Sequence, residues 1–389
     1  MYKNLNLFEK LLVLSILIMP YTLLRIGFVG VGEIIILSLF LYEFKIRKLN
    51  FKIKDFIFTK FWIFYIIISL LGFSYNVLFL NYKTGTIDGM LFDLSAYILV
   101  LLSCYTLESY QERIGMNFIS IIKTIFYSSS FVLTALYFLS FFTPSLLGLP
   151  LLYNDKFAPL VNNLHQISMF IIFLPFIGLL VFENEKNLLI RLITVLFIIF
   201  LFKMGIETGS FKAYIGLFLG LFVYIFLKLL SFSKGRYKNS LLFISLALGI
   251  LLLLINVDFI VNLITKIFIE EDINEGRVNL YSKAIKVGFT SPIIGLGAGA
   301  HILNGIKFWD AHQSLLTIFL QTGLIGLLAF FTLYIKMIKK YFKTIPFFAA
   351  FCAISIYILG GDIMRRLPIW ILLFLLFYYN TIHKNRIKN

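Results

Sequence analysis

The sequence predicts an all-α polytopic membrane protein with about twelve transmembrane helices. Of its 389 residues, 60% are hydrophobic and only 14% are charged, whereas a soluble domain of this length would expose far more charge. Apolar runs of about 18 residues or more recur along the whole chain, and each is long enough to cross roughly 30 Å of hydrocarbon. No Gly/Ser linker divides the chain, so residues 1–389 are predicted to form a single integral membrane domain.

Twelve spans can be placed on these apolar runs by their length and hydropathy. The first is interpreted as a retained anchor, because it lacks an obvious small-residue cleavage site. The two cysteines, Cys104 and Cys352, fall inside spans and are interpreted as packing residues. The spans cover residues 7–24, 27–44, 56–74, 90–107, 117–142, 164–182, 191–206, 211–230, 240–257, 312–334, 346–360 and 367–382.

The net charge of +16 is explained by membrane topology rather than by nucleic-acid binding. With the N-terminus inside, the loops on one side hold 23 of the 35 Lys and Arg residues. This bias is the positive-inside pattern, and it predicts that both termini are cytoplasmic. The clearest inside loops are KIRKLNFKIK (45–54) and KMIKKYFK (336–343).

One extracytoplasmic loop, residues 258–311 between spans nine and ten, is longer than every other loop. Long loops on a rigid scaffold often carry function. Residues 259–271 and 274–289 have apolar residues at helical spacing, which predicts two short helices, the first of them on the membrane surface.

A Gly-rich stretch, IIGLGAGAH (293–301), follows these helices and predicts a bend. Its glycines, Gly295 and Gly297 among them, allow a tight turn and a close approach of the backbone to a ligand. The stretch does not follow a soluble βαβ strand, so it is not interpreted as a nucleotide-binding loop.

Several polar and ionisable residues are predicted at the outer membrane boundary. An ionisable residue costs about 2.5–3.5 kcal/mol at the centre of a membrane helix and less near the interface. Cations that converge on one outer face therefore favour an anionic ligand, and lipid phosphates are the natural candidates. The set comprises His312 at the start of span ten, Arg277 and Tyr281 on the loop helix, Lys212 with Ser210 at the outer end of span eight, and His165 with Asn163 at the outer end of span six.

The charged members of this set also have structural interpretations. His312 could cap its helix, Arg277 could be a solvated loop charge, and Lys212 could extend to the outer headgroups.

Other polar residues near the outer side are given structural roles on similar grounds. His165 could belong to an N-terminal helix cap with Asn162 and Asn163. Between the last two spans, Arg365 and Arg366 are interpreted as ion-pair partners of Asp362, at i+3 and i+4. His301 carries little information at this level.

The order of three motifs resembles a known family. A loop helix headed by Arg277 precedes Pro292-Ile293-Ile294-Gly295-Leu296-Gly297, and His312-Gln313-Ser314-Leu315-Leu316 follows. This order is similar to that of the O-antigen ligase and Wzy-type polysaccharide polymerase superfamily, with its P-x-x-G-x-G bend and its H-N-x-x-L motif before a glycine-containing helix. NNLHQ (162–166) and ETGSFKAYIG (207–216) resemble two further segments of the family.

The resemblance covers residues 155–335 in motif detail and the entire chain in topology. Two positions depart from it. Gln313 replaces the usual asparagine, and Phe211 stands where the family has an arginine after Gly-Ser. Lys212 follows Phe211 and would supply a cation there, but without the planar fork that binds phosphate bidentately.

The resemblance implies glycosyl transfer between lipid-linked glycans on the outer face of a bacterial plasma membrane. The donor would be an oligosaccharide on undecaprenyl pyrophosphate, and the acceptor a sugar hydroxyl on another lipid-linked repeat unit. The product would be O-antigen, capsular or similar surface polysaccharide. A chain-length regulator and a flippase are the expected protein partners, and neither a cofactor nor nucleic acid is expected.

This chemistry assigns roles to the residues. Arg277 and Lys212 would stabilise the negative charge that develops on the pyrophosphate leaving group. His312 would be the general base that deprotonates the acceptor hydroxyl. Direct attack would invert the anomeric centre, and the scheme needs no metal ion. The expected substrate-binding residues besides Lys212 are Ser210, Tyr281, His165, Asn163, Gly295 and Gly297.

Two other functions are kept as alternatives. A ligase that transfers finished glycan to lipid A core would share the same motifs. A lipid-linked glycan flippase or transporter would favour ionisable residues in mid-span and repeat symmetry, whereas the charges here lie mainly at span ends. A polymerase is favoured over a ligase because polymerases are the more numerous group and because the Phe-rich and Lys-rich composition resembles theirs slightly more.

Overall fold

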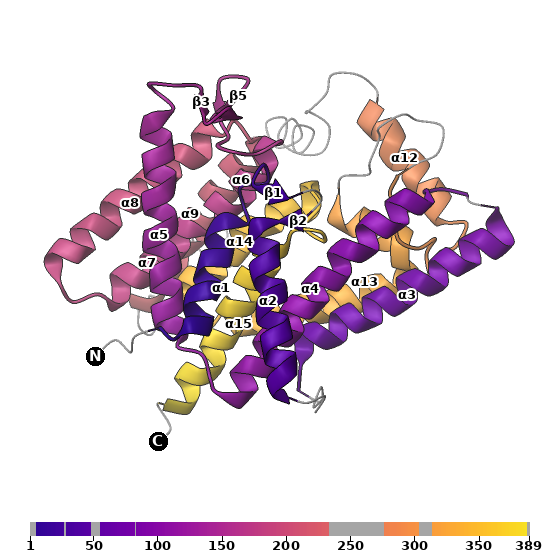
Figure 1. Cartoon of the computed structure of the whole chain (residues 1–389), viewed down its shortest axis with the longest axis horizontal. Coiled ribbons are helices and arrows are strands. Elements are labelled where there is room, and N and C mark those ends of the chain that lie inside the picture. The colour runs from indigo at the N-terminus through magenta and orange to yellow at the C-terminus, as the bar shows by residue number, and fades with distance from the viewer. Residues whose placement is uncertain are drawn as a thin grey trace.

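The computed structural model describes residues 5–26, 29–47, 55–81, 83–232, 276–302 and 313–386. For residue 47 and for 276–279 and 380–386 it describes the backbone but not the side chain. The helices are α1 (Leu7–Ile18), α2 (Val31–Arg47), α3 (Ile57–Leu80), α4 (Ile87–Arg113), α5 (Phe118–Leu139), α6 (Leu164–Ile171), α7 (Leu174–Asn184), α8 (Leu188–Glu207), α9 (Phe211–Phe232), α12 (Gly276–Gly288), α13 (Ser314–Tyr341), α14 (Ile345–Gly360) and α15 (Leu367–Arg386) (Figure 1).

The predicted all-α class is confirmed in the described part of the chain. Seven helical stretches there are long and apolar enough to cross a membrane, with α6 and α7 together forming one of them. Eleven of the twelve predicted spans coincide with a helix or helix pair, while span nine, at 240–257, lies outside the described residues. The first helix is shorter than the predicted span: α1 has 12 residues and ends at Ile18, because Pro20 has no N–H with which to extend it.

Within the described residues, three short antiparallel hairpins connect helices and are not predicted by the sequence. They pair β1 (Arg25–Ile26) with β2 (Val29–Gly30), β3 (Ser145–Leu146) with β4 (Leu149–Pro150), and β5 (Leu152–Tyr153) with β6 (Lys156–Phe157). The second hairpin turns through Leu147 and Gly148 and the third through Asn154 and Asp155, all with positive φ. Two such residues in succession are what a tight two-residue turn requires.

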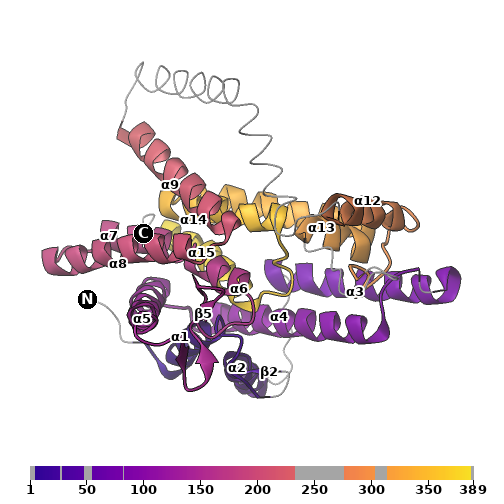
Figure 2. The ribbon, with the colours of Figure 1, turned by 90° about the horizontal axis from the view of Figure 1, so that it is seen from above.

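Helix α15 occupies the centre of the molecule. Its residues from Leu367 to Phe377 are almost all buried, and it packs against α4, α5, α6 and α13. A helix that is apolar on every side, as LPIWILLFLLF is, fits a position surrounded by other helices. Trp370 of α15 makes an edge contact with Trp62 of α3, with ring centroids 4.9 Å apart. In Figure 2, α15 lies between α7 and α8 on one side and α3, α4 and α13 on the other.

A buried carboxylate joins three helices at one end of the bundle. Glu108, near the end of α4, accepts hydrogen bonds from the backbone N–H groups of Phe58 (3.1 Å) and Thr59 (3.0 Å) in the first turn of α3. It also accepts one from the hydroxyl of Tyr378, near the end of α15, at 2.7 Å. The carboxylate thereby partners N–H groups of α3 that have no acceptor within their own helix.

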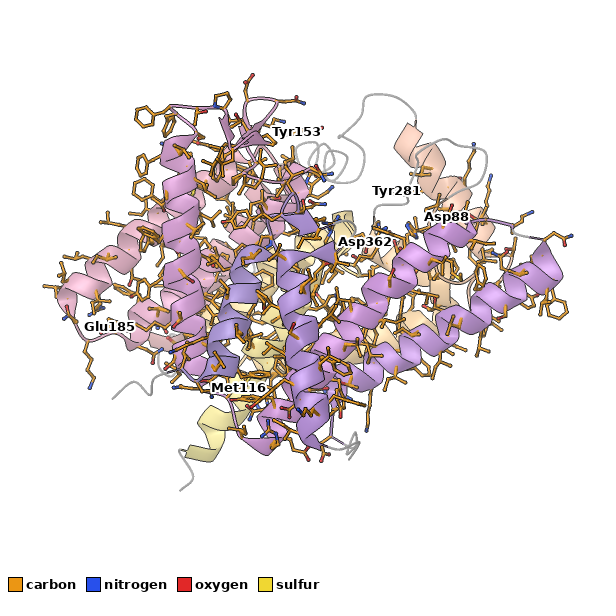
Figure 3. The ribbon with its side chains drawn as sticks, in the orientation of Figure 1. Asp88, Met116, Tyr153, Glu185, Tyr281 and Asp362 are labelled. Atoms are coloured by element: carbon orange, nitrogen blue, oxygen red, sulfur yellow. The ribbon has the colours of Figure 1, made fainter. Side chains whose placement is uncertain are left out.

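The start of α1 lies at the same end. The Asn6 amide donates to the hydroxyl of Tyr110 in α4 at 2.7 Å, and Glu9 accepts from the backbone N–H of Asn117 at 2.9 Å. In Figure 3, Met116 and Glu185 lie toward this end, whereas Tyr153 and Asp362 lie toward the other. Segments that the charge pattern assigns to one side of the membrane therefore meet at one end of the bundle.

Helix α13 is broken at Gly323, where φ is 61° and ψ is −157°. The Gly-rich bend after α12, residues 292–297, packs against α13 at this break. Leu324 and Ile325 donate their N–H groups to the carbonyls of Pro292 (2.8 Å) and Ile293 (3.2 Å) instead of to their own helix. The carbonyls of Leu320 and Gln321 accept from Leu296 (2.7 Å) and Gly297 (3.0 Å). These four backbone groups beside the break thus find partners in the bend, as a membrane interior requires.

Candidate functional site

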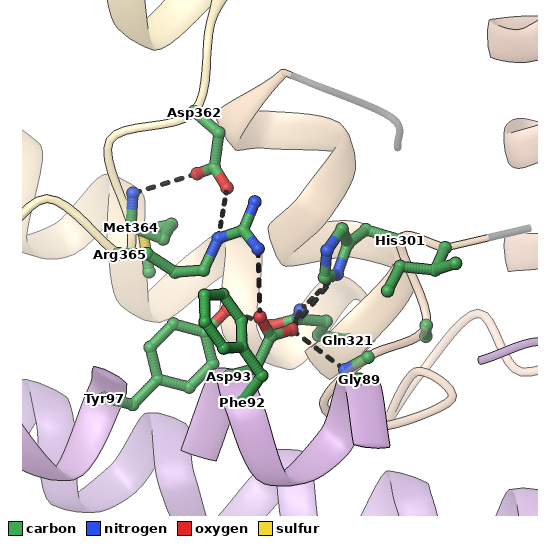
Figure 4. Close-up of polar contacts among 12 residues, drawn as sticks. Gly89, Phe92, Asp93, Tyr97, His301, Gln321, Asp362, Met364 and Arg365 are labelled. Atoms are coloured by element: carbon green, nitrogen blue, oxygen red, sulfur yellow. Dashed lines mark hydrogen bonds and ion pairs between the residues drawn. The ribbon is translucent and has the colours of Figure 1, made fainter. Parts of the chain in front are cut away.

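Helix α4, helix α13 and the bend bring three polar side chains together in the interior. Asp93 lies in the second turn of α4, Gln321 lies two residues before the break in α13, and His301 ends the Gly-rich bend. All three are completely buried. The Gln321 amide donates to Asp93 Oδ2 at 2.6 Å, and His301 Nδ1 lies 3.1 Å from the same oxygen (Figure 4).

Asp93 is the centre of this cluster because several donors converge on its carboxylate. Besides the Gln321 amide, the backbone N–H of Gly299 donates to Oδ2 at 2.9 Å, and His301 Nδ1 also lies 3.0 Å from the Gln321 amide nitrogen. Oδ1 faces Nη1 of Arg365 at 3.4 Å. A carboxylate without water needs such donors, since an unpaired buried charge is very costly.

Two tyrosines fix the orientation of the Gln321 amide. The hydroxyls of Tyr65 in α3 and Tyr97 in α4 donate to Gln321 Oε1 at 2.9 and 2.7 Å. The oxygen therefore faces the tyrosines and the amide nitrogen faces Asp93, which can only accept when ionised. This arrangement satisfies both halves of the amide and ties α3, α4 and α13 to one another.

The loop between α14 and α15 adds a cation to the cluster. Arg365 Nε lies 3.4 Å from Oδ2 of Asp362, so the ion pair expected from the i+3 spacing is confirmed. The same guanidinium also reaches Asp93, which the sequence does not predict, and it stacks over Phe92 at 5.7 Å. The Arg365 side chain is 15% exposed, whereas Asp93 is fully buried, so the cluster reaches the protein surface through Arg365.

The beginning of α13 is tied to this loop. Ser314, in its first turn, donates its N–H and its hydroxyl to the carbonyl of Gly361, at 2.7 and 2.8 Å. The Ser314 hydroxyl accepts from the N–H of Ile363 at 3.0 Å. Gln313 caps the helix by accepting from the N–H of Leu316. The segment Gln313–Ser314 of the predicted His-Gln-Ser-Leu-Leu motif therefore lies beside the loop that carries Asp362 and Arg365.

The structure brings His165 and Ser210 together. Nδ1 of His165 lies 3.1 Å from the Ser210 hydroxyl, which in turn lies 2.7 Å from the hydroxyl of Tyr357 in α14. Ser168 contacts the same tyrosine hydroxyl at 2.6 Å. Asn163 is the N-cap of α6 and accepts from the N–H of His165 at 2.9 Å, so the predicted cap is confirmed.

The other described members of the predicted set occupy several environments. Lys212 is 5% exposed and lies in the first turn of α9, two residues after Ser210. Tyr281 is half-buried on α12, beside the apolar cluster that joins α12 to α13.

Gly295 and Gly297 contact the protein's own backbone. A Cβ on Gly295 would lie 2.4 Å from the Thr322 nitrogen, and one on Gly297 would lie 2.3 Å from the Phe73 Cα. Packing therefore explains why glycine stands at both positions, and a binding role for them stays a prediction.

The two residues assigned to catalysis are not placed by this geometry. His312 lies outside the described residues, one position before Gln313. Arg277 lies on the first turn of α12, and its side chain is outside the described set. Their roles stay predictions. Within the described ranges, no three His, Cys, Asp or Glu side chains gather in a way that could hold a metal ion.

Sequence reasoning missed Asp93, Gln321 and His301. A signal was present in two cases, because Asp93 and Gln321 both lie inside predicted spans, where polar residues are expensive and often functional. His301 gave no comparable signal, since a single histidine after a Gly-rich bend fits a loop equally well.

The fold and its hydropathy define a polytopic α-helical membrane protein with a buried carboxylate–amide–imidazole cluster. No protein-family model, no curated protein and no solved structure matches the chain.

Proposed function

We propose that this protein is a membrane glycosyltransferase that polymerises lipid-linked oligosaccharide repeat units into a surface polysaccharide. The donor and acceptor are carried on undecaprenyl pyrophosphate, and the transfer is inverting and independent of metal. In the proposed topology the chain crosses the plasma membrane twelve times, both termini are cytoplasmic, and residues 258–311 form the long extracytoplasmic loop. The active site then faces the periplasm or the cell exterior.

One observation carries the proposal beyond the motif resemblance. The charged cluster around Asp93 and Arg365 lies at one end of the bundle. The Glu108 junction lies at the opposite end, where the helix ends next to the basic loops meet. Ionisable groups at membrane depth are expensive and commonly mark a functional site. A cluster on this side could act on a glycan that is already across the membrane and still tethered by its prenyl chain.

The second polar group on this side supports the proposal in a different way. His165, Ser210 and Tyr357 present hydroxyl and imidazole groups, which suit hydrogen bonds to sugar hydroxyls. Lys212, two residues after Ser210, supplies a cation for the pyrophosphate. The loop from Gly361 to Arg366 follows α14, which carries Tyr357, and contributes Arg365 to the Asp93 cluster, so one segment of the chain joins the two groups.

The proposed reaction assigns the chemistry as follows. The bond between the anomeric carbon and the pyrophosphate oxygen breaks. Arg277 and Lys212 stabilise the negative charge that develops on the leaving group. The acceptor hydroxyl forms the new glycosidic bond and loses its proton to His312, whose unperturbed pKa of about 6.5 suits a general base. The prenyl anchor would hold the scissile bond at the membrane boundary, where the motif places this histidine.

Deletion of the gene in its host, with the surface glycan and the lipid-linked pool resolved on gels, tests the proposal. A polymer ladder that collapses to a single repeat unit supports polymerisation. If full-length polymer accumulates on undecaprenyl pyrophosphate while the acceptor stays bare, the protein is a ligase. If single lipid-linked units accumulate on the inner face, the protein is a flippase and the assignment of His312 falls.

A further inference from the structure

A closed ring of hydrogen bonds joins α6 and α14 to the start of α9. Nδ1 of His165 lies 3.1 Å from the Ser210 hydroxyl, and that hydroxyl lies 2.7 Å from the hydroxyl of Tyr357. The Tyr357 hydroxyl lies 2.6 Å from the hydroxyl of Ser168, which donates to the backbone carbonyl of His165 at 3.2 Å. The ring therefore begins at the imidazole of His165 and ends at the backbone of the same residue.

His165 is the member of this ring that reaches the protein surface. Ser168 and Tyr357 are completely buried and Ser210 is 2% exposed, whereas His165 is partly exposed. The rings of His165 and Tyr357 also meet edge to face, with their centroids 6.5 Å apart. Packing and hydrogen bonding from the buried side therefore both hold the imidazole in place.

The carbonyl of His165 decides the direction of every bond in the ring. A carbonyl oxygen can only accept, so the single proton of the Ser168 hydroxyl points toward it. Tyr357 must then donate to Ser168, and Ser210 must donate to Tyr357, because each hydroxyl has one proton. The Ser210 oxygen is left to accept from Nδ1 of His165, as it also accepts from the N–H of Ala213 at 3.4 Å. This assignment alone satisfies every contact of the ring, and it places the imidazole proton on Nδ1.

We propose that Tyr357 is a positioning residue that holds His165 as the Nδ1–H tautomer, so that Nε2 accepts a hydrogen bond from a hydroxyl of the glycan. The bond made by one ring nitrogen of a neutral histidine fixes the role of the other. The inference rests on the proposed function for the identity of the ligand. Tyr357 acts through Ser210, since it is completely buried.

The tautomer selects the chemistry of the group that faces Nε2. An unprotonated ring nitrogen offers a lone pair and needs a donor such as a sugar O–H. The oxygens of an ionised phosphate offer only lone pairs, so Nε2 of this tautomer repels them. His165 is thereby assigned to the sugar part of the lipid-linked substrate and not to its pyrophosphate.

Two substitutions open the ring at different bonds. Tyr357→Phe removes the acceptor of the Ser210 proton, which can then turn to Nδ1 and leave the imidazole proton on Nε2. Ser168→Ala removes the acceptor of the Tyr357 proton, which can turn to Ser210 with the same result at His165. Each variant deletes one oxygen atom and changes no charge.

A matched control comes from the neighbouring helix pair. The hydroxyl of Tyr334 in α13 lies 2.8 Å from the hydroxyl of Ser355 in α14, and this pair includes no histidine. Tyr334→Phe therefore removes the same atom from the same kind of contact without touching the ring.

Magic-angle-spinning NMR of the full-length protein in liposomes, with 15N-labelled histidine, measures the tautomer directly. The chain has four histidines, and the signals that His165→Gln removes belong to His165. The spectra are recorded about two pH units above the ordinary imidazole pKa of about 6.5, where the neutral form prevails. We expect at least about a tenfold excess of Nδ1–H in the wild type and in Tyr334→Phe, because the other tautomer loses a hydrogen bond. In Tyr357→Phe and Ser168→Ala the Nε2–H form should dominate.

The spectra decide the role of Tyr357. A wild type that is mainly Nε2–H overturns the inference, and so does an Nδ1–H tautomer that persists in Tyr357→Phe. If Tyr357→Phe does not fold, Ser168→Ala gives the same decision.

The contact with a glycan hydroxyl is tested separately, from the glycan ladder of a deletion strain that carries each variant gene. Less or shorter polymer in Tyr357→Phe, with normal polymer in Tyr334→Phe, supports the contact. Full polymer in Tyr357→Phe despite a changed tautomer overturns it. Because the NMR measurement needs no transfer, failure of the proposed polymerase function in the gene deletion would leave the tautomer assignment intact.

Discussion

The side-chain amide of Gln321 donates to the carboxylate of Asp93 across 2.6 Å, although 228 positions separate the two residues in the sequence. The contact joins α4 to the last turn of α13 before its break. Because the same amide also accepts from Tyr65 and Tyr97, one side chain connects three helices through polar contacts alone.

Gln321→Leu should therefore destabilise the protein strongly. The substitution keeps the volume but removes a donor from Asp93 and an acceptor from two buried hydroxyls. Leaving such groups unsatisfied costs about 1–3 kcal/mol each, so a loss of about 3 kcal/mol or more in the free energy of unfolding is expected. Thermal unfolding in detergent would measure it, with Ser95→Ala on the exposed face of α4 as the control. Equal stability of both variants would contradict the structural role of the amide.

Gly323→Ala should prevent the bend from docking into α13. A Cβ at this position would lie 2.3 Å from the carbonyl oxygen of Ile293, and the backbone conformation is open essentially only to glycine. We expect a loss of at least about 3 kcal/mol in stability, or no folded protein. Gly115→Ala is the control, since its φ is +80° but nothing lies within 4 Å of the added Cβ. It should cost only about 1 kcal/mol of backbone strain, and a similar loss in both variants would show that the clash is unimportant.

The topology predicts which introduced cysteines react from outside the cell. Leu147→Cys lies in the turn of the β3–β4 hairpin, where the side chain is 96% exposed. Lys186→Cys lies in the exposed connection between α7 and α8. A membrane-impermeant maleimide should label the first in intact cells and the second only after permeabilisation. The reverse pattern would invert the proposed orientation and move the Asp93 cluster to the cytoplasmic side.

Variants of the two residues assigned to catalysis test the proposed mechanism. His312→Ala should abolish polymer or reduce it at least about a hundredfold at normal protein levels, because the acceptor proton loses its base. Arg277→Lys should shorten or diminish the polymer, since the lysine lacks the planar fork. The amount and length of the polymer made by each variant are measured from the glycan ladder of a deletion strain that carries the variant gene. His383→Ala serves as the control at the predicted cytoplasmic end, and full polymer in His312→Ala would remove the base assignment.

The helices were predictable because length and hydropathy decide whether a segment can cross a membrane. Segments such as Leu188–Glu207 and Phe211–Phe232 are apolar over most of their length, so the predicted spans agree with the structure. The three hairpins were not predicted because each has only two residues per strand, too few for an alternating pattern to show.

The candidate site was less predictable, for a different reason. The sequence indicated that His165, Ser210 and their neighbours lie at outer helix ends, and the structure places His165 beside Ser210. Asp93 and His301 come from α4 and from the bend, and nothing local in either segment indicates that they meet. Arg365 shows both cases: its contact with Asp362 is between residues three positions apart in one loop, whereas its contact with Asp93 depends on how the helices pack.

The break in α13 has a consequence for how the protein is made. The N–H groups of Leu324 and Ile325 and the carbonyls of Leu320 and Gln321 are i, i+4 pairs, so they can bond one another in a continuous α13 before residues 292–297 dock. Docking then replaces bonds within the helix by bonds to the bend, and no backbone group is left in lipid without a partner. Membrane integration of α13 and docking of the bend are therefore separable steps of biogenesis. A chain with residues 292–297 scrambled should still integrate into the membrane, and its α13 should be continuous where the native helix is broken.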